Sequence, residues 1–297
     1  MKMTVDGSAP TLSTREKAYG LFLDEEGQPQ LIDCAVLFWD VMGVRAMSTQ
    51  PPRQAVEDLR GLRAAVSRAR DRANTEEEGF LRCSSWFTDN VVLAAPVWGP
   101  MDEELVIGPT QVDAAYMQLL MLDGGYLSRG AITFGPHFMD KSFVYGPALI
   151  EANDLEGAKS VDDPDGRDGN RWPCVVVSEG VAARNRKMAK DFYADPERSG
   201  LIRELLLDED DVAFVNQLGI WIEEEDDERR LVYGLKEMRG TILAKLEEFS
   251  AGSRVWEKWR WLADYQDFVL TGFGLDEPAF TVGLEPQFSF TSFAETL

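Results

Sequence analysis

The chain has 297 residues, 44% of them hydrophobic, and a formal net charge of −22 from 52 acidic against 30 basic residues. Its length and hydrophobic content are sufficient for the packed core of one large or two small domains. The acidic balance works against a surface that tracks phosphates, so we expect no nucleic-acid partner. A small anionic ligand is still allowed, because a bound divalent ion can reverse the charge of its site.

The three cysteines, Cys34, Cys83 and Cys174, are widely spaced and lie in apolar runs, which favours reduced, buried thiols over a disulfide framework. No segment reaches the roughly 20 apolar residues that span a bilayer, and residues 1–10 lack an apolar signal core. We therefore expect a cytoplasmic protein that does not bind membranes. His137 is the single histidine, which nearly excludes zinc sites built on histidine and Ser-His-Asp triads, and we give it no role.

The first strong element follows an arm of residues 1–30 that is rich in glycine, proline, serine and charge. Residues 32–43, IDCAVLFWDVMG, are a short apolar run bounded by glycine and predict a buried central strand that ends in a turn. Because side chains alternate along a strand, Phe38 and Asp40 are expected on one face, with Leu37 on the other. Asp40 lies at the carboxyl end of this strand.

A helix is predicted over 52–73, where apolar residues recur every three or four positions behind a pair of prolines. Residues 80–97 hold two β-rich runs separated by Thr88, Asp89 and Asn90, which suit a tight hairpin turn. Asp89 is therefore expected near a hairpin tip. The next predicted elements are a helix over 110–122, a strand over 125–135, a short strand leading into a helix over 142–158, and a buried strand over 173–181.

Beyond residue 181 the pattern changes to helices. We place a boundary near Asp195, so that 31–195 form an α/β sandwich with one sheet face covered and 196–297 form a mainly helical region; a single intertwined domain is the alternative. The Asp- and Gly-rich segment 161–170 is interpreted as a surface loop or active-site flap. The predicted C-terminal helices lie over 201–207, 211–222, 235–249 and 255–270.

Two carboxylates, those of Asp40 and Asp89, are expected at adjacent strand ends. A carboxylate on the apolar side of a core strand is costly unless it is paired or bound to a metal ion. With no histidine or cysteine beside them, these oxygens suit Mg²⁺ or Mn²⁺, and substrate phosphates would complete the shell. The alternative is that each aspartate only starts a turn.

A resemblance to class III nucleotidyl cyclases rests on three segments. FWDVMG, from Phe38 to Gly43, resembles the Phe-x-Asp-x-x-Gly of that family, and a predicted helix follows it there too. FTDN around Asp89 resembles the hairpin with the second metal aspartate, and residues 143–156 resemble the Gly-x-x-Val-Asn-x-Ala-x-Arg-Leu segment. Order and spacing make the resemblance, over residues 36–179, fairly specific. It implies a βαββαβ sandwich of the cyclase type with a C-terminal helical appendage.

The resemblance implies that two divalent cations, Mn²⁺ or Mg²⁺, bind to Asp40 and Asp89, with the carbonyl of Val41 as a further ligand. It also implies attack of the ribose 3′-hydroxyl on the α-phosphorus of a nucleoside triphosphate, with pyrophosphate leaving. The nucleotide contacts that it implies on this strand and turn are Phe38, Val41, Met42, Gly43 and Val44.

The chain departs from the family at its usual asparagine and arginine. Counting four and eight residues past Gly146, those positions hold Ile150 and Asp154. Arg45, directly after the phosphate turn, is our first choice for the missing arginine, although a solvated surface arginine is an equal alternative. The other candidates are Asn153, Arg129 and Lys141, or a different register.

The base-reading positions also differ. Where purine-selecting adenylyl cyclases carry Lys and Asp, this chain has Ser85 and Phe143, so the charged adenine-reading pair is missing; Phe38 and Phe143 are candidates to pack on the base, with a core role as the alternative. In this respect the chain resembles the pyrimidine cyclases of bacterial Pycsar anti-phage defence, which also carry a C-terminal aromatic helical segment. We favour UTP as substrate, with CTP open.

In class III cyclases the active site forms between two catalytic domains. The resemblance therefore implies a head-to-tail homodimer in which residues near Phe143 complete a pocket whose metal ions sit on the other chain. It also implies a cyclic nucleotide product, cUMP or cCMP, that a separate effector protein binds. The alternatives are a purine cyclase and a degenerate cyclase-fold module that binds a nucleotide without turnover. Trp256, Trp259 and Trp261 are expected to bury against the catalytic domain or a second subunit.

Overall fold

The structure is a computed structural model that describes residues 14–73, 81–98, 103–157 and 171–297. Of the expected N-terminal arm it describes the part from residue 14 onward, where the short helix α1 (Thr14–Gly20) packs on the sheet. The loop expected over 161–170 lies outside the described residues. No helix in the described part of the chain is long and apolar enough to cross a membrane.

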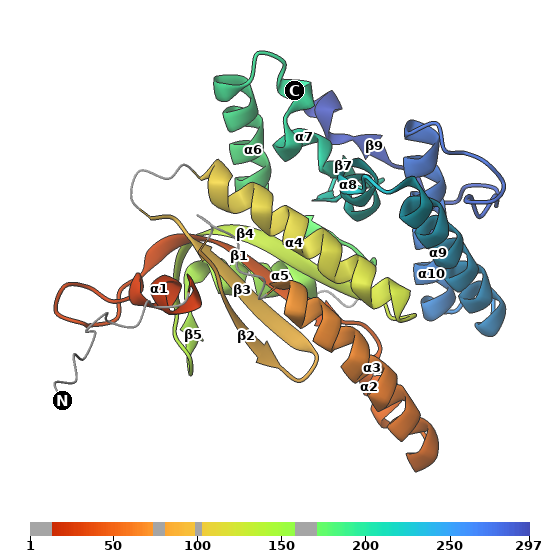
Figure 1. The fold of residues 1–297 in the computed structure, drawn as a ribbon, viewed down its shortest axis with the longest axis horizontal. Coiled ribbons are helices and arrows are strands. Elements are labelled where there is room, and N and C mark those ends of the chain that lie inside the picture. The colour runs from red at the N-terminus through yellow and green to blue at the C-terminus, as the bar shows by residue number, and fades with distance from the viewer. Residues whose placement is uncertain (1–13, 74–80, 99–102, 158–170) are drawn as a thin grey trace, which may run out of the picture.

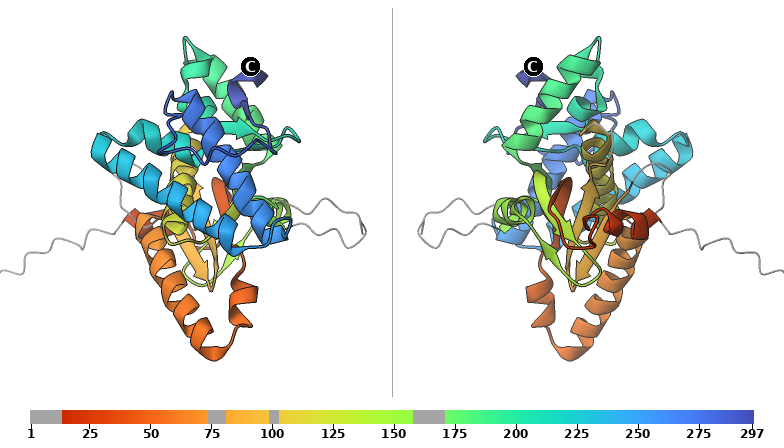
Figure 2. Two further views of the ribbon diagram at one scale, coloured as in Figure 1. Left: turned by 90° about the vertical axis from the view of Figure 1, so that its right-hand side faces the viewer. Right: turned by 90° about the vertical axis from the view of Figure 1, so that its left-hand side faces the viewer.

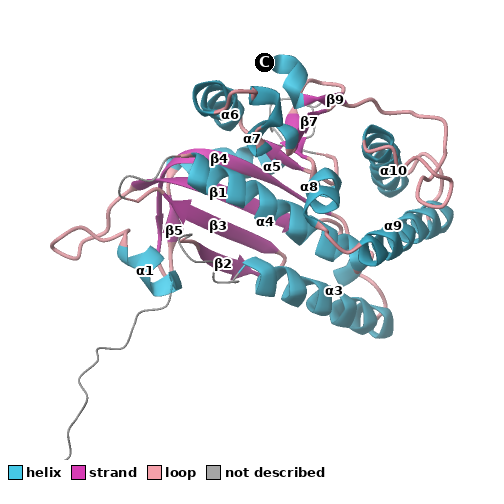
Figure 3. Ribbon diagram, turned by 45° about the horizontal axis from the view of Figure 1, so that its top comes forward, coloured by secondary structure: helices cyan, strands magenta, loops and turns pink. Residues whose placement is uncertain are grey.

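The first half of the chain folds in the βαββαβ order that the resemblance implies, which confirms the predicted fold class. Helices α3 and α4 lie along one face of the sheet (Figures 1 and 3). With α2, α3 also projects beyond the end of the strands as a V-shaped pair (Figure 2). The bounds are β1 (Ile32–Val41), α2 (Val44–Ser48), α3 (Pro52–Ala73), β2 (Cys83–Phe87), β3 (Asn90–Pro96), α4 (Glu104–Asp123) and β4 (Ser128–Met139).

The four strands of this core form an antiparallel sheet in the order β2-β3-β1-β4. On the central strand β1, Asp40 pairs with Asn90 of β3 on one side and with Arg129 of β4 on the other. Only Thr88 and Asp89 join β2 to β3, and Thr88 adopts a left-handed conformation with φ of 43°. Asp89 is therefore in the two-residue turn of a tight hairpin, as predicted.

Alternation along β1 decides which side chains reach which face. Leu37, Trp39 and Val41 are buried against α3 and α4 in the main core. Phe38 and Asp40 point to the opposite face, where α1 and α5 (Pro147–Gly157) cover part of the sheet. The predicted separation of Phe38 and Asp40 from Leu37 is confirmed.

The second half of the chain adds strands to the same sheet. β5 pairs with the end of β4 as a short hairpin, and the path continues from β4 through β6, β8 and β7 to β9. The bounds are β5 (Val144–Tyr145), β6 (Val175–Val177), α6 (Glu179–Phe192), η1 (Pro196–Arg198), α7 (Gly200–Arg203), β7 (Leu205–Leu207), β8 (Ala213–Val215), α8 (Gln217–Glu224), α9 (Glu228–Glu248), α10 (Arg254–Gly272), β9 (Thr291–Ser292) and η2 (Phe293–Thr296).

Residues 196–297 are rich in helix, as expected, but their strands cross the boundary that the sequence suggested near Asp195. Two of the predicted helices are wrong in part: 201–207 divides into α7 and the strand β7, and 211–222 divides into the strand β8 and α8. These strands are only three residues long and fully buried, so they show no alternation that could separate them from helix. Sheet hydrogen bonding across the boundary favours the single intertwined domain.

An aromatic cluster holds α10 against this extended sheet. Trp261 is 1% exposed and stacks on Tyr265 with ring centroids 5.6 Å apart, while Phe214 of β8 lies 5.4 Å from it. The Tyr265 hydroxyl donates a hydrogen bond to Asn216 Oδ1 and accepts one from the Leu218 amide, both at 2.9 Å. Of the three tryptophans expected to bury against the catalytic domain or a second subunit, Trp259 and Trp261 are buried, and Trp256 is half-buried.

Candidate active site

Asp40 and Arg129 face each other at the centre of the candidate site. They are cross-strand partners on β1 and β4, so their side chains share one face of the sheet. The Arg129 Nε lies 3.8 Å from Asp40 Oδ2, and both side chains are largely shielded, at 26% and 19% exposed. The guanidinium therefore compensates a carboxylate that would be costly on this otherwise apolar strand.

Glu156, near the end of α5, is a second acidic partner of the same guanidinium. Its Oε1 lies 2.5 Å from Arg129 Nε, and its side chain is only 7% exposed. The stripe Ala148, Ala152 and Glu156, with one residue per turn, is the buried face of α5. A hydrogen bond of 2.7 Å from Thr133 Oγ1 to the Ala148 carbonyl fastens the start of this helix to β4.

Asp89 reaches the same end of the sheet through the hairpin turn. Its carbonyl accepts a hydrogen bond of 3.1 Å from the Val41 amide, so the backbone of the turn is tied directly to the end of β1. Its Oδ1 accepts a hydrogen bond of 2.5 Å from Thr88 Oγ1, and the charge on Asp89 is close enough to act on Asp40. The structure therefore brings the two predicted metal ligands to one edge.

The electrostatics of Asp40 reflect this crowding. Burial, the negative charge of Glu156 and that of Asp89 together raise the pKa of Asp40 to about 7, against the lowering effect of Arg129. Burial also raises the pKa of Glu156, against the lowering effect of Arg129. In physical terms, the carboxylates of Asp40 and Glu156 share one guanidinium, Asp89 adds a third negative charge nearby, and the site gains from any further cation that enters it.

Four of the implied nucleotide contacts, Val41 to Val44, lie between the end of β1 and the start of α2. The Met42 amide already donates a hydrogen bond of 2.9 Å to the Leu127 carbonyl, so it is committed to the fold. Gly43 has φ of 87°, a left-handed conformation that suits glycine, and its carbonyl accepts the first hydrogen bonds of α2. The amides of Gly43 and Val44 remain the expected phosphate contacts of this turn.

The candidates for the missing arginine lie in different places. Arg45 is exposed on α2, and Lys141 is an exposed partner of Glu16 at 3.8 Å. Asn153 is exposed on α5, on the side of the helix turned away from the sheet. Of the four, Arg129 is the one that the structure pairs with Asp40.

Ile150 and Asp154, which occupy the family's asparagine and arginine positions, are both exposed on α5. They are four residues apart and share one outward face of the helix. The residues at the family's asparagine and arginine positions are therefore exposed to solvent and do not lie on the buried face of α5 that carries Glu156.

The implied base contacts are not all near Asp40. Phe38 is partly buried two residues before Asp40 on the same face, and Ser85 lies in the same cross-strand row as Phe38, through Val92 of β3. Phe143 is 58% exposed beyond the far end of β4, roughly 30 Å of strand away from Arg129. It stacks on Tyr145 with ring centroids 6.3 Å apart. One chain therefore does not bring Phe143 to its own aspartates.

The residues at this edge fit a hard divalent cation. Asp40 and Asp89 offer carboxylate oxygens whose charges interact, and the end of β1 adds the Val41 carbonyl. No group of three histidine, cysteine or acidic side chains among the described residues is arranged to enclose an ion. A two-carboxylate site is the open type that Mg²⁺ accepts when substrate phosphates and water complete its shell.

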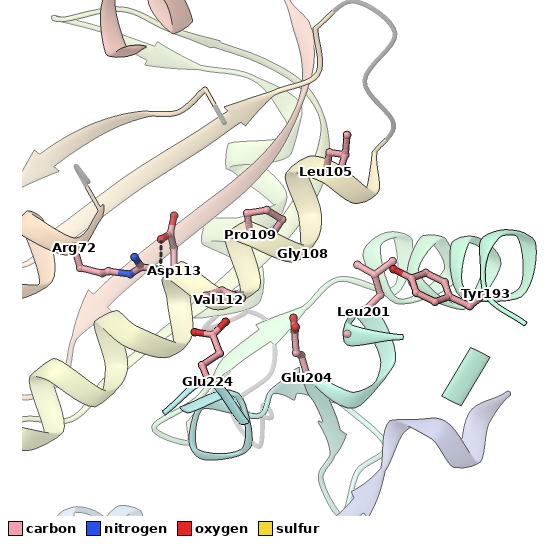
Figure 4. A pocket seen from close by; sticks show the side chains of 11 residues that line it. Arg72, Leu105, Gly108, Pro109, Val112, Asp113, Tyr193, Leu201, Glu204 and Glu224 are labelled. Atoms are coloured by element: carbon pink, nitrogen blue, oxygen red, sulfur yellow. Dashed lines mark ion pairs between the residues drawn. The ribbon is translucent and has the colours of Figure 1, made fainter. Parts of the chain in front are cut away.

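A separate pocket of about 590 Å³ lies between α4, α7 and α8 on the helical side of the sheet (Figure 4). Glu204 and Glu224 line it, together with Asp113, which forms ion pairs with Arg82 and, at 3.7 Å, with Arg72. None of the predicted site residues lines this pocket. This pocket is therefore separate from the candidate active site.

Glu204 in this pocket predicts a pH dependence of stability. Burial, with the charges of Glu224 and Glu223, raises its pKa from 4.5 to about 8. The folded protein therefore binds a proton that the unfolded chain has released, and this stabilisation is lost as the pH rises from about 4.5 through about 8. Between pH 5 and pH 8.5, the free energy of unfolding of the unsubstituted protein is expected to fall by about 1–3 kcal/mol more than that of Glu204→Gln. Urea denaturation at the two pH values measures this difference.

The control is Glu197→Gln, which removes the same charge from an exposed position on η1. Its unfolding free energy should follow that of the unsubstituted protein across the same pH range. Equal pH dependence in Glu204→Gln and the unsubstituted protein would contradict the prediction.

Sequence reasoning missed Glu156. Its signal was present as an acidic residue on the alanine stripe of a helix that packs on a sheet, four residues past Ala152. The family positions Ile150 and Asp154 share the helix but not its buried face, so the resemblance points away from Glu156.

Comparisons with known proteins add little beyond the fold. No family model matches the chain, and no curated protein matches it with significance. Among solved structures it is similar to the adenylyl cyclase CyaB from P. aeruginosa, known from a crystal structure, with a TM-score of 0.41 and 12% sequence identity, over 63% of this chain and 94% of that chain. A similarity of this size identifies no family, and we rest no argument about function on it.

Proposed function

We propose that this protein is a two-metal nucleotidyl cyclase, with Asp40 and Asp89 as its metal ligands. The observation that supports it best is the pairing of a shielded aspartate at the end of the central strand with an arginine, beside a second aspartate in a hairpin turn. In a βαββαβ sheet this arrangement gathers oxygen donors and one fixed cation at a single edge, as phosphoryl transfer requires.

The position of each residue at this edge suggests its role. Asp40, Asp89 and the Val41 carbonyl would hold the ions, and the amides of Gly43 and Val44 would receive the triphosphate. Bound there, divalent ions would supply Lewis-acid activation of the ribose 3′-hydroxyl and charge neutralisation for the leaving pyrophosphate. The new bond joins the 3′-oxygen to the α-phosphorus, the bond from that phosphorus to the pyrophosphate oxygen breaks, and the hydroxyl proton passes to water.

Arg129 is the residue we assign to the triphosphate in place of Arg45. Its guanidinium is fixed beside Asp40, whereas Arg45 is exposed on α2. A guanidinium beside the metal ligands can neutralise charge that develops on the phosphate oxygens, which is the role of the family's missing arginine.

Our proposal for the substrate is a pyrimidine nucleoside triphosphate, UTP before CTP. It rests on Ser85 and Phe143 at the two base-reading positions, where neither side chain offers the charged pair that reads adenine. The remote position of Phe143 supports a homodimer in which Phe143 of one chain serves the aspartates of the other. On the sequence resemblance, the product would be a cyclic nucleotide signal in anti-phage defence, bound by a separate effector.

A binding module without turnover is the second candidate. It is favoured by Ile150 and Asp154, which remove the usual catalytic side chains from α5. It is opposed by the shielded acids around Arg129, because a site with no ion to hold gains nothing from carboxylates that repel one another.

Incubation with each of the four ribonucleoside triphosphates and Mn²⁺, followed by mass identification of the products, tests the proposal. We expect a cyclic pyrimidine monophosphate and pyrophosphate in equal amounts. Turnover of ATP or GTP alone would overturn the pyrimidine assignment and keep the cyclase. Nucleotide binding without turnover of any of the four would favour the binding module.

A further inference from the structure

Glu156 has no role in the function proposed above, yet it makes the shorter contact to the arginine of the site. Arg129 Nε is 2.5 Å from Glu156 Oε1 and 3.8 Å from Asp40 Oδ2. The guanidinium is therefore anchored to α5, and Asp40 lies at the limit of ion-pair distance. The two carboxylates approach one cation from different elements of the fold.

An ion on Asp40 would change this balance. A carboxylate that binds a divalent cation loses most of its attraction for a neighbouring guanidinium, and the ion itself repels that guanidinium. This repulsion favours movement of the Arg129 guanidinium away from Asp40, since its side chain is already 26% exposed and has solvent to enter. The metal ion competes with Arg129 for the Asp40 carboxylate but not for Glu156, which is 7% exposed on the buried stripe of α5.

Stability does not account for Glu156. A buried ion pair costs about as much in desolvation as it returns in attraction, and an apolar residue in its place is often neutral or stabilising. The Glu156 carboxylate also lies near enough to Asp40 for the two negative charges to repel each other. A glutamate in this place lowers the intrinsic stability of the site and so points to a use of the fixed guanidinium.

We propose that Glu156 is a positioning residue, which keeps the Arg129 guanidinium at the triphosphate when a metal ion occupies Asp40. The inference rests on the proposed function and deepens it by separating two tasks. Asp40 is released to hold the ion, and Glu156 takes over the arginine. The fixed cation then stays on the same chain as the metal ligands.

The test is a double-mutant cycle of Glu156→Gln and Arg129→Ala, with kcat and KM measured for the triphosphate that the unsubstituted protein converts in Mn²⁺. Arg129→Ala is expected to lower kcat about 100-fold. Glu156→Gln keeps the shape but not the charge and is expected to lower kcat about 10-fold, with little change in KM. The double variant should be no slower than Arg129→Ala alone, because Glu156 acts only through the arginine.

Asp264→Asn is the matched control. Asp264 pairs with Arg260 at 2.9 Å on α10, with side chains 2% and 5% exposed, so this variant also removes a charge from a buried pair, but on a helix that carries none of the candidate site residues. It is expected to lower the melting temperature and leave kcat unchanged. Glu156→Gln behaving like Asp264→Asn, or effects of Glu156→Gln and Arg129→Ala that multiply, would overturn the proposal.

A second readout separates this inference from the proposed function. Binding of Mn²⁺ with inorganic pyrophosphate, measured by calorimetry, needs no turnover. Glu156→Gln and Arg129→Ala are each expected to weaken it about 10-fold, and the double variant no further. If the protein converts no triphosphate but the two substitutions weaken pyrophosphate binding without adding to each other, the role of Glu156 stands and the cyclase is rejected. If the protein is a cyclase and Glu156→Gln changes neither turnover nor pyrophosphate binding, the role of Glu156 is rejected and the proposed function stands.

Discussion

Replacement of Asp40 or Asp89 by alanine is expected to abolish cyclic nucleotide formation, with a loss of kcat of at least about 1,000-fold. Each substitution removes one of the two carboxylates that we assign to the metal ions, and the neighbouring Glu156 is engaged with Arg129. Product formation in Mn²⁺, measured by mass over hours, checks this expectation.

The fold should survive both substitutions. Removal of Asp40 ends its repulsion with Glu156 and Asp89 and leaves Arg129 paired with Glu156, so the melting temperature should not drop. Asp33→Ala is the matched control, because Asp33 is an exposed aspartate near the start of the same strand. Activity within tenfold of the unsubstituted protein in Asp40→Ala would show that the reaction, if present, does not use this edge.

Replacement of Trp261 by alanine is expected to lower the free energy of unfolding by about 3–5 kcal/mol. Trp261 packs between Tyr265, Trp172 and Phe290, and truncation leaves a cavity that rigid aromatic neighbours cannot fill. Because β8 belongs to the sheet that carries Asp40, unfolding should remain one transition, with circular dichroism and tryptophan fluorescence changing at the same urea concentration.

Tyr233→Ala, at a position 67% exposed on α9, is the control and should change the free energy by less than about 0.5 kcal/mol. Two separate transitions in the unsubstituted protein would contradict a single cooperative sheet. They would restore the boundary near Asp195 that the sequence suggested.

The elements around the candidate site were predictable because each has a strong local signal. The apolar run around Trp39 is short and bounded by Gly43, which favours a central strand, and the turn residues at Asp89 fix the hairpin register. Helix α3 begins at Pro52 and ends at Ala73, as its periodicity predicts. Helix α4 starts six residues before its predicted start at Thr110, because Pro109 lies inside the helix, where sequence reasoning takes proline for a boundary.

What the sequence did not reveal depends on contacts between distant segments. Leu205–Leu207 and Ala213–Val215 are strands only because the sheet edge beyond β6 accepts them, and their short apolar runs fit a helix equally well. The ion pair of Arg129 with Glu156 joins β4 to α5, and neither residue reveals the other by spacing alone. Arg129 was one of four candidates in the sequence, and its place opposite Asp40 distinguishes it.

The position of β9 bears on how the protein is made. Thr291 and Ser292 cover the outer side of β7, a strand whose three leucines are all buried. During synthesis that leucine strand emerges from the ribosome more than eighty residues before its cover, a separation given by their positions in the chain. A nascent or prematurely stopped chain would display an apolar sheet edge in the meantime, the kind of surface that chaperones bind and that otherwise pairs with other chains.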